Sequence, residues 1–158
     1  MLHPLSRESN YKDSLKKFFV DNLQTAEQIP VTFDKMINFP DVFQEGFRNQ
    51  NDRVDRWVSI ISGDITERTP VITAYPTIYV CTRRDFEGFR LAQLRDTVRG
   101  LFEISRSIPF YRSYAPPVEW ELLTHMVIEY LGESAQLTTK DDTKFKRMSV
   151  RLKWAAMI

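Results

Sequence analysis

Cysteine, histidine and glycine are scarce in this chain of 158 residues, which has one Cys, two His and five Gly. The single cysteine, Cys81, excludes a disulfide within the chain. It lies in an apolar, β-branched run, so we interpret it as a buried thiol and not as a reactive one. The only histidines are His3 and His125, and Cys81 is near neither in sequence. This spacing does not match a metal site, and we predict that none is present. We interpret His125 as a solvated or paired side chain.

The scarcity of glycine and histidine also argues against common catalytic arrangements. A phosphate-binding loop needs closely spaced glycines before a helix, so that backbone N–H groups can approach the anion. The segment RRDFEG (83–88) has only Gly88. Nucleophilic catalysis needs a serine or cysteine beside a base, and few bases are available. We assign no catalytic residue and expect no cofactor and no enzymatic activity. A hydrolase that uses two carboxylates stays open, although no pair stands out.

Net charge of one sign is nearly absent, because 22 Lys and Arg balance 21 Asp and Glu. The formal net charge of +1 gives no overall attraction to nucleic acid or to an anionic membrane. No apolar run is long enough to span a bilayer, and the first residues lack the pattern of a signal peptide. We therefore expect a soluble, cytoplasmic chain that does not bind membranes.

The composition is that of one globular domain, residues 1–158, with 42% apolar and 13% aromatic residues. Two amphipathic helices are predicted. The apolar positions of the first are Tyr11, Leu15, Phe18, Phe19, Leu23 and Ala26, and Pro30 follows its end. The second covers Glu87 to Phe102, with its stripe at Leu91, Leu94, Val98, Leu101 and Phe102. Asp85 is predicted to cap this helix by accepting bonds from backbone N–H groups two or three residues further on.

Several segments have the β-branched and aromatic content of strands. The segment Val31–Asp34 is a short candidate, and Arg53–Ser62 and Val71–Thr82 are longer ones. Pro76 interrupts the last of these, so we favour a strand over Thr77–Thr82 that extends backwards as an arm. With Gly63–Pro70 as a polar connector, the two long segments predict a hairpin with a projecting loop.

The clearest patterns are two alternating segments near the end of the chain. The first has Val118, Trp120, Leu122, Thr124, Met126, Ile128 and Tyr130 on one face and Glu119, Glu121, Leu123, His125, Val127 and Glu129 on the other. The second has Met148, Val150, Leu152 and Trp154 on its apolar face and Arg147, Ser149, Arg151 and Lys153 opposite. Antiparallel pairing would set acidic side chains across from basic ones. Because both apolar faces use even numbers, paired residue numbers should sum to an even number.

The element order is therefore helix, three strands, helix, three strands. It predicts an α+β fold, a mainly antiparallel β-sheet with two α-helices packed on one face, plus a projecting β-hairpin arm. The polar segment Gly132–Lys144 is expected to be a loop or a mobile flap.

Six arginines form a basic set around the second helix, and two interpretations stay open. The members are Arg83, Arg84, Arg90, Arg95, Arg99 and Arg106. The first interpretation is an ordinary solvated helix face, since Asp85, Glu87, Asp96 and Glu103 are interspersed. The second is a surface that symmetry repeats around a ring, where it would face a neighbouring subunit, a lumen, a DNA backbone or an acidic partner.

Aromatic side chains are unusually frequent in the segment Lys35–Asp52, which also contains Pro40 and Gly46. Phe39, Phe43 and Phe47 would be exposed in an ordinary loop, which isolated monomers rarely tolerate. We interpret them as a candidate inter-subunit contact.

The order of elements resembles a known family. An amphipathic helix precedes VDRWVSIISGD, a β-arm leads to TIYVCTRRDFEGFRLAQLRDTVRGLF, and alternating strands close the chain. This pattern is similar to that of the tail terminator (tail completion) proteins of long-tailed bacteriophages. The likeness covers nearly the whole chain by element order and length, and its motifs are diffuse.

The resemblance implies a small protomer that assembles into a sixfold ring at the tail–neck junction of a virion, assembled in the host cytoplasm. The ring would cap the tail tube, end its polymerisation and provide a docking surface for the head. Expected partners are further copies of the chain, the tail tube protein, a head–tail connector or neck protein, and DNA passing through the lumen. Two alternatives stay open: another neck component, such as a head–tail adaptor or tube protein, and a monomeric ligand-binding or hydrolytic domain.

Overall fold

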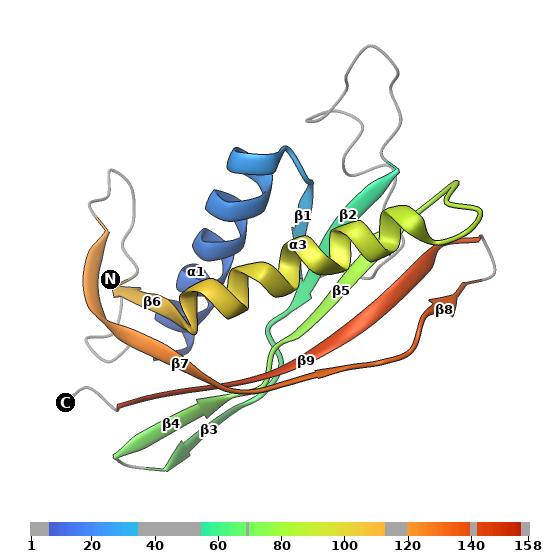
Figure 1. The fold of residues 1–158 in the computed structure, drawn as a ribbon. Coiled ribbons are helices and arrows are strands. Elements are labelled where there is room, and N and C mark those ends of the chain that lie inside the picture. The colour runs from blue at the N-terminus through green and yellow to red at the C-terminus, as the bar shows by residue number, and fades with distance from the viewer. Residues whose placement is uncertain (1–6, 35–54, 69, 113–119, 140–141, 156–158) are drawn as a thin grey trace.

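The computed structural model describes residues 7–34, 55–68, 70–112, 120–139 and 142–155. Two α-helices and nine strands lie in these ranges (Figure 1). The helical elements are α1 (Arg7–Phe19), a π-helical turn that continues it (Val20–Thr25) and α3 (Phe89–Ser105). The strands are β1 (Val31–Phe33), β2 (Arg56–Ile61), β3 (Ile65–Arg68), β4 (Val71–Ala74), β5 (Thr77–Thr82), β6 (Ser107–Arg112), β7 (Glu121–Glu133), β8 (Leu137–Thr138) and β9 (Lys144–Ala155).

The strands form one sheet around β9. On one side of β9, strands β5 and β4 pair end to end along its length, and on the other side β7 and β8 pair with it. Beyond these, β2 pairs with β5, β3 with β4 and β6 with β7. Each of these pairings is antiparallel, and only β1 runs parallel to its neighbour, β2. The predicted α+β fold with a mainly antiparallel sheet is therefore confirmed.

The hairpin arm is present, but its connector differs from the prediction. The polar segment Gly63–Pro70 was expected to be a loop, and instead it contains strand β3. The β2–β5 hairpin continues through a kink into the β3–β4 hairpin, and β4 pairs with the last residues of β9. Backbone hydrogen bonds to β4 organise this polar stretch, which side-chain polarity alone does not reveal. The predicted break at Pro76 is confirmed, since β4 ends at Ala74 and β5 begins at Thr77.

The kink between the two hairpins depends on Gly63. Its φ of +67° is in the left-handed region, and a Cβ atom there would lie 2.1 Å from the carbonyl oxygen of Tyr75. The Tyr75 N–H donates to the Asp64 carbonyl over 3.0 Å, and the Val150 N–H donates to the Pro76 carbonyl over 3.1 Å. The kink is thus fixed by backbone contacts that leave no room for a side chain at residue 63.

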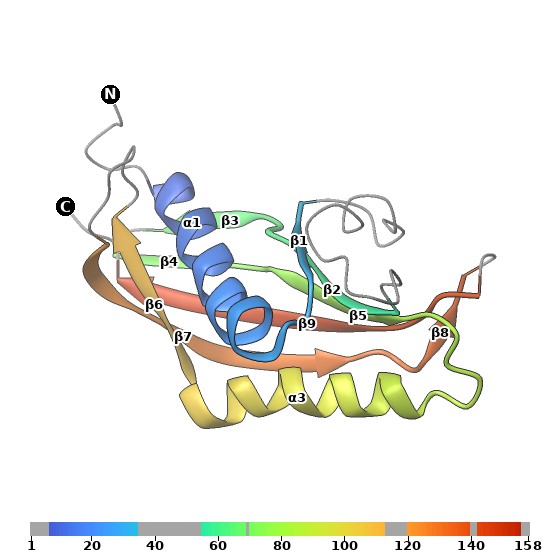
Figure 2. The same cartoon turned by 90° about the horizontal axis from the view of Figure 1, so that it is seen from above.

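Both helices pack on the same face of the sheet, as predicted. The even-numbered side chains of β9, Met148 to Trp154, are buried in one cluster with the apolar stripes of α1 and α3. Tyr11 of α1 stacks on Trp154 with ring centres 5.7 Å apart, and Phe19 of α1 meets Phe102 of α3 at 5.9 Å. In Figure 2, α3 runs along the sheet and α1 crosses it obliquely. No described helix is long and apolar enough to cross a membrane.

The predicted register of β7 and β9 is right for two of the six residue pairs and wrong for the other four. Ile128 faces Leu152, which satisfies the even-sum rule. A bulge at Glu129 then makes Tyr130 face Arg151 and Leu131 face Val150. Because a bulge adds one residue to one strand, it exchanges the two faces of the strand after it. Tyr130 was expected in the core and is 54% exposed instead, while Leu131 packs against the core.

A second irregularity changes the beginning of β7. The pairing with β6 shifts between Phe110 and Tyr111, so that Leu122 pairs with Tyr111. Leu122 is 51% exposed and Trp120 is 42% exposed, although both were expected on the core face. The polar segment Gly132–Lys144 was expected to be a loop or flap, but part of it is strand. Its first two residues, Gly132 and Glu133, belong to β7, and strand β8 pairs with β9.

Candidate functional site

The strand-to-helix junction between β5 and α3 is built around the carboxylate of Asp85. This side chain is buried and accepts hydrogen bonds from the backbone N–H groups of Leu91 (2.8 Å) and Arg90 (3.3 Å). The hydroxyl of Thr82 donates to it as well, over 3.2 Å. Burial alone would raise the pKa of Asp85, but these hydrogen bonds outweigh it and hold the pKa below its usual value.

The donors to Asp85 lie five and six residues further on, not two or three. The difference arises because Asp85 and Gly88 enclose a turn before the helix, with the Gly88 N–H directed at the Asp85 carbonyl, and α3 starts at Phe89. Gly88, whose φ is +77°, occupies the N-cap position without a side-chain bond. Asp85 therefore satisfies free N–H groups of the first helical turn from outside the standard cap position.

Four of the six arginines of the basic set already bind other side chains of the same chain. Arg90 forms an ion pair with Asp55. The Nε of Arg83 donates to the hydroxyl of Thr143 over 3.1 Å, and its guanidinium lies 5.6 Å from the ring centre of Trp57. These contacts attach the junction to β2 and to the start of β9, so both arginines have a structural role that is independent of any partner.

Arg95 and Arg99 share one carboxylate at the end of β7. Arg95 holds Glu133 with two bonds of 2.7 and 2.9 Å and also pairs with Asp96. Arg99 lies 3.6 Å from the same carboxylate and pairs with Glu103 at 3.0 Å. The hydrogen bonds from Arg95 lower the pKa of Glu133, despite its partial burial. Reversing both arginine charges would therefore disturb the α3–β7 contact as well as any interface.

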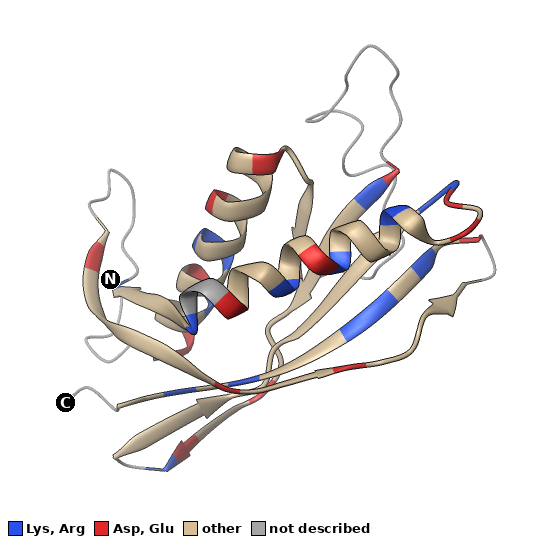
Figure 3. Ribbon diagram, in the orientation of Figure 1, with Lys and Arg blue, Asp and Glu red and all other residues tan. Residues whose placement is uncertain are grey.

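Arg84 and Arg106 differ from the other four arginines. Both are exposed, and neither forms an ion pair with another described residue. They flank α3 at its two ends, each with positive φ. Figure 3 shows basic and acidic residues mixed along α3 itself. Among the described residues this arrangement favours the solvated helix face over a continuous basic surface. The aromatic set Phe39, Phe43 and Phe47 lies outside the described residues.

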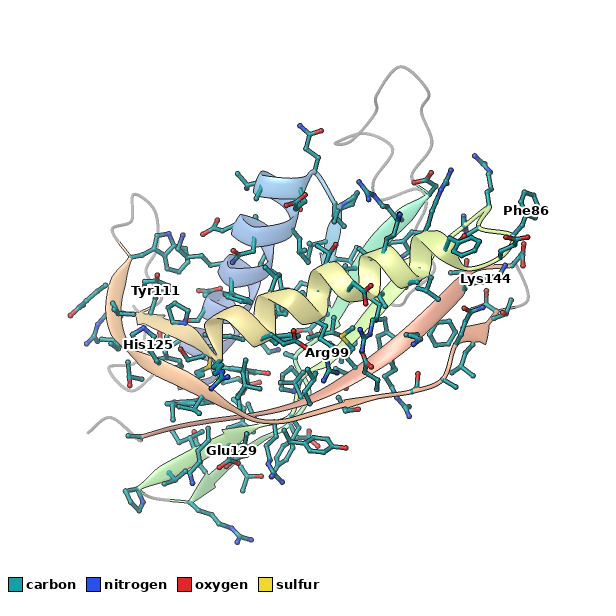
Figure 4. All side chains as sticks on the ribbon, viewed as in Figure 1. Phe86, Arg99, Tyr111, His125, Glu129 and Lys144 are labelled. Carbon is teal, nitrogen blue, oxygen red and sulfur yellow. The ribbon has the colours of Figure 1, made fainter. Side chains whose placement is uncertain are left out.

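The junction exposes two aromatic side chains, a feature that the sequence interpretation missed. Phe86 is 88% exposed and Phe89 is 69% exposed. Figure 4 shows Phe86 at one end of the molecule, near Lys144. We call Phe86 and Phe89 the aromatic corner. Their position in the sequence could have indicated this exposure, since both flank Gly88 and neither belongs to the apolar stripe of the helix.

A second set of exposed apolar side chains lies along β7 and at Trp120, just before this strand. Its members are Trp120, Leu122, Val127 and Tyr130, which are 42–54% exposed. Met126 and Ile128, between them, point into the core, so Val127 points away from it. We call these four residues the β7 stripe. The alternating sequence pattern did not reveal this stripe. The two bulges turn Leu122 and Tyr130 away from the core, although their even numbers predicted the core face.

A shallow groove borders the stripe. Its volume is about 370 Å³, and α1 and the β6–β7 pair line it with residues that include Lys17, Asp21, Tyr111 and His125. Lys17 is paired with Asp21 at 2.8 Å and lies 5.3 Å from the ring centre of Trp120. His125 is exposed. The charges in the groove are thus already paired, and no group of three or more His, Cys, Asp or Glu side chains in the described ranges could hold a metal ion.

Comparisons with known proteins give a fold and no family. No protein-family model and no curated protein matches the chain. Solved structures do match, among them one whose title states no function. It has a TM-score of 0.53 and 9% identity, and the match covers 92% of this chain and 95% of that one. At this identity the likeness extends to the fold alone, over nearly the full length of both chains.

Proposed function

We propose that this chain is a structural assembly protein of a phage tail, a terminator that forms a ring on the end of the tail tube. In this role it ends tube polymerisation and gives the head or neck a docking surface, without catalysis. The ring, expected to contain six copies, belongs to the tail–neck junction of the virion and assembles in the host cytoplasm. The observation that carries the proposal is the exposure of large apolar side chains on two separate surfaces.

Exposure on this scale is costly for an isolated protein. Fully burying a Phe or Leu side chain is favourable by about 1.5–3 kcal/mol. Single exposed apolar residues are common, but a grouped set marks an interaction surface. The aromatic corner and the β7 stripe together hold six of the eight exposed large apolar side chains in the described ranges. A protein that works by assembly accounts for both surfaces, and the sequence resemblance supplies the kind of assembly.

The proposed partners are further copies, the tail tube protein and a connector or neck protein. DNA passing through the lumen would meet the ring only through non-specific phosphate contacts. Within the basic set, Arg84 and Arg106 suit this contact, because neither forms an ion pair with another described residue.

The experiment is co-expression of this chain with a phage tail tube protein, followed by measurement of tube lengths by electron microscopy. A terminator is expected to give short tubes with a ring of density at one end. Tubes of the same length distribution with and without the chain would contradict the proposal. A ring on the head side alone would assign the chain to another neck component.

A further inference from the structure

We infer that β9 binds the phosphate backbone of duplex DNA through a row of basic side chains on its exposed face. We call this set the β9 row, and its members are Arg147, Arg151 and Lys153. The inference rests on the proposed function for the place of contact, which is the lumen of the ring through which DNA would pass. The binding itself is a property of one chain and can be measured apart from the ring.

The alternation of β9 separates this row from the core. The strand contains five Lys and Arg and no Asp or Glu, and Figure 3 shows its basic segments in blue. The even-numbered residues from Met148 to Trp154 are buried in the cluster that the helices cover. Because successive side chains of a strand point to opposite faces, the odd-numbered residues point away from this cluster. All three members of the row are exposed.

A single carboxylate pairs with the row among the described residues. Glu129, at the bulge of β7, lies 3.1 Å from Arg151 and 3.3 Å from Lys153. Arg147 forms no ion pair with another described residue. Three positive charges against one negative charge leave an excess of two. This excess distinguishes the β9 row from the basic set around α3, in which four of the six arginines already bind other side chains.

The strands beside the row do not restore the balance. The residues that pair with the row on β4 and β5 are Thr73 and Tyr79, and those on β7 are Val127 and Tyr130. None of these four is acidic, although opposite charges are the stabilising charged pairs across an antiparallel sheet. Arg68 of β3 lies on the same face, because its partner on β4 pairs in turn with an odd-numbered residue of β9. It is exposed and adds a further positive charge.

The middle of the row has short side chains, which let a DNA backbone approach. Ser149 lies between Arg147 and Arg151, is exposed and pairs with Thr77 of β5. Its hydroxyl can donate to a phosphate oxygen, a contact that serine makes in DNA complexes. From residue 147 to residue 153 the row extends for about 20 Å. This length corresponds to about six phosphates along one strand of a duplex.

The aromatic rings near the row favour duplex over single-stranded DNA. Proteins that bind single strands offer free rings on which bases stack. Here Tyr79 packs against Phe145 with ring centres 5.9 Å apart. The ring of Tyr130 lies over Gly132, where a Cβ atom would be 2.5 Å from its hydroxyl oxygen, and the Arg151 guanidinium is 5.9 Å from its centre. Because these rings are engaged within the chain, the row suits the phosphates of a duplex better than unstacked bases.

An acidic protein partner fits this face less well than DNA does. The centre of a protein interface is usually depleted of charged residues. Here the charged row itself occupies the strand around which the sheet is built. DNA presents regularly spaced negative charges along its backbone, and these match a row of bases without an apolar centre.

The test measures how the full chain binds a short labelled duplex of mixed sequence, by fluorescence anisotropy at about 50 and 200 mM salt. The wild type is expected to bind without sequence preference, with a Kd of about 10⁻⁴–10⁻⁶ M. The affinity should fall as the salt concentration rises, because phosphate contacts release bound counterions. One of the two strands alone is the comparison and should bind more weakly than the duplex.

The first pair of variants removes charge. The row variant carries Arg147→Gln and Arg151→Gln and keeps Lys153 paired with its carboxylate. Its control carries Lys16→Gln and Arg56→Gln, which removes the same charge at exposed positions on α1 and β2. The slope of log K against log salt should become shallower by about 1.8 in the row variant, about 0.9 for each phosphate contact. The control should keep the wild-type slope.

The second pair of variants adds charge and removes no ion pair. Ser149→Glu places a carboxylate in the middle of the row, and Gln93→Glu places one on the exposed side of α3. Ser149→Glu should weaken binding at least about tenfold at low salt, because the carboxylate pairs with the arginines beside it and repels phosphate. Gln93→Glu should leave the affinity unchanged. Circular dichroism should show the wild-type spectrum for all four variants.

The outcomes separate this face from the proposed function. The inference is overturned by a wild type that does not bind the duplex at low salt, or that binds the single strand more tightly. It is also overturned if the row variant or Ser149→Glu binds no more weakly than its control. If the chain forms a ring and shortens tail tubes but gives one of these results, the face is wrong and the function stands. If it binds the duplex through the row but forms no ring, the function is wrong and the DNA-binding face stands.

Discussion

At the scale of single residues, Asp85 is the side chain on which the strand-to-helix junction depends. Its buried carboxylate satisfies two backbone N–H groups of α3 and one hydroxyl. Asp85→Ala leaves these donors without a partner and is expected to lower the free energy of unfolding by about 1–2 kcal/mol. Urea unfolding at pH 7 measures it. Asp96→Ala, on the exposed face of the same helix, is the control and should cost less than about 1 kcal/mol.

The Asp85 prediction has a pH dependence with a definite sign. The pKa of Asp85 is lowered in the folded state. The stability from this group is therefore complete above the unfolded-state pKa, about 3.9, and is lost as the pH falls through the lower folded value. The difference between wild type and Asp85→Ala should be constant near neutrality and shrink below about pH 4. A difference that grows in acid would contradict this role.

Glu133 joins α3 to the end of β7 through Arg95 and Arg99. The side chain of Glu133 is 18% exposed, and its bidentate bond to Arg95 is of the stronger kind. We expect Glu133→Gln to destabilise the fold by roughly 1 kcal/mol at pH 7. Its folded pKa is also lowered, so this loss should vanish in acid.

Thermal unfolding of Glu133→Gln beside Glu103→Gln tests the point. Glu103 is 65% exposed and, among the described residues, pairs with Arg99 alone, so Glu103→Gln should change the stability by close to zero. An equal loss of stability for Glu133→Gln and Glu103→Gln would contradict this account, because it would mean that the carboxylate shared by two arginines stabilises the fold no more than an exposed one.

The basic set illustrates the limit of sequence reasoning at this scale. The spacing of Arg95 and Arg99 placed both on one side of the helix, and α3 has that form. Their main partner, Glu133, is 38 and 34 residues away along the chain. Long-range ion pairs of this kind depend on strand register, which local spacing does not contain. The sequence therefore predicted the charged face but not its neutralisation.

At the scale of elements, the kink at Gly63 determines the course of the hairpin arm. Gly63→Ala would put a Cβ atom 2.1 Å from the Tyr75 carbonyl at a φ of +67°. We expect a loss of about 2–3 kcal/mol, because the strain and the clash add. Chemical denaturation measures it. Gly100→Ala is the matched control, since apart from the adjoining residues and the backbone of α3 itself no atom lies within 4 Å of its Cβ position. It should stabilise the fold by about 0.5–1 kcal/mol. The same sign for both substitutions would contradict the account.

The β-bulges and the unexpected strand β3 decide which strand predictions were right and which were wrong. Clean alternation predicted the buried face of β9 correctly, because Met148, Val150, Leu152 and Trp154 are all buried, but it predicted only two of the six β7–β9 pairs. The bulge at Glu129 was not visible, since an extra residue leaves no mark in the composition of the strand. Strand β3 was missed because its residues, Ile65 to Arg68, are mainly polar, and pairing with β4 organises them. Pairing energy that comes from a distant partner is what single-sequence patterns lack.

At the scale of the whole molecule, the fold exposes two sets of large apolar side chains, one at the start of α3 and one along β7. One helix start provides the aromatic corner and two bulges provide the β7 stripe. Both depend on departures from regular structure, which explains why the sequence indicated assembly in general terms and left these residues unassigned. Natural proteins keep such departures where they serve a function.

The central claim is that the chain closes into a ring, and the solution mass tests it most directly. Light scattering on a sizing column, over a hundredfold dilution, is expected to give one discrete mass of about six chains, unchanged by dilution until the ring dissociates. A strict monomer at every concentration would contradict the claim. So would a mass that rises continuously with concentration, because that describes an open filament and not a closed cap.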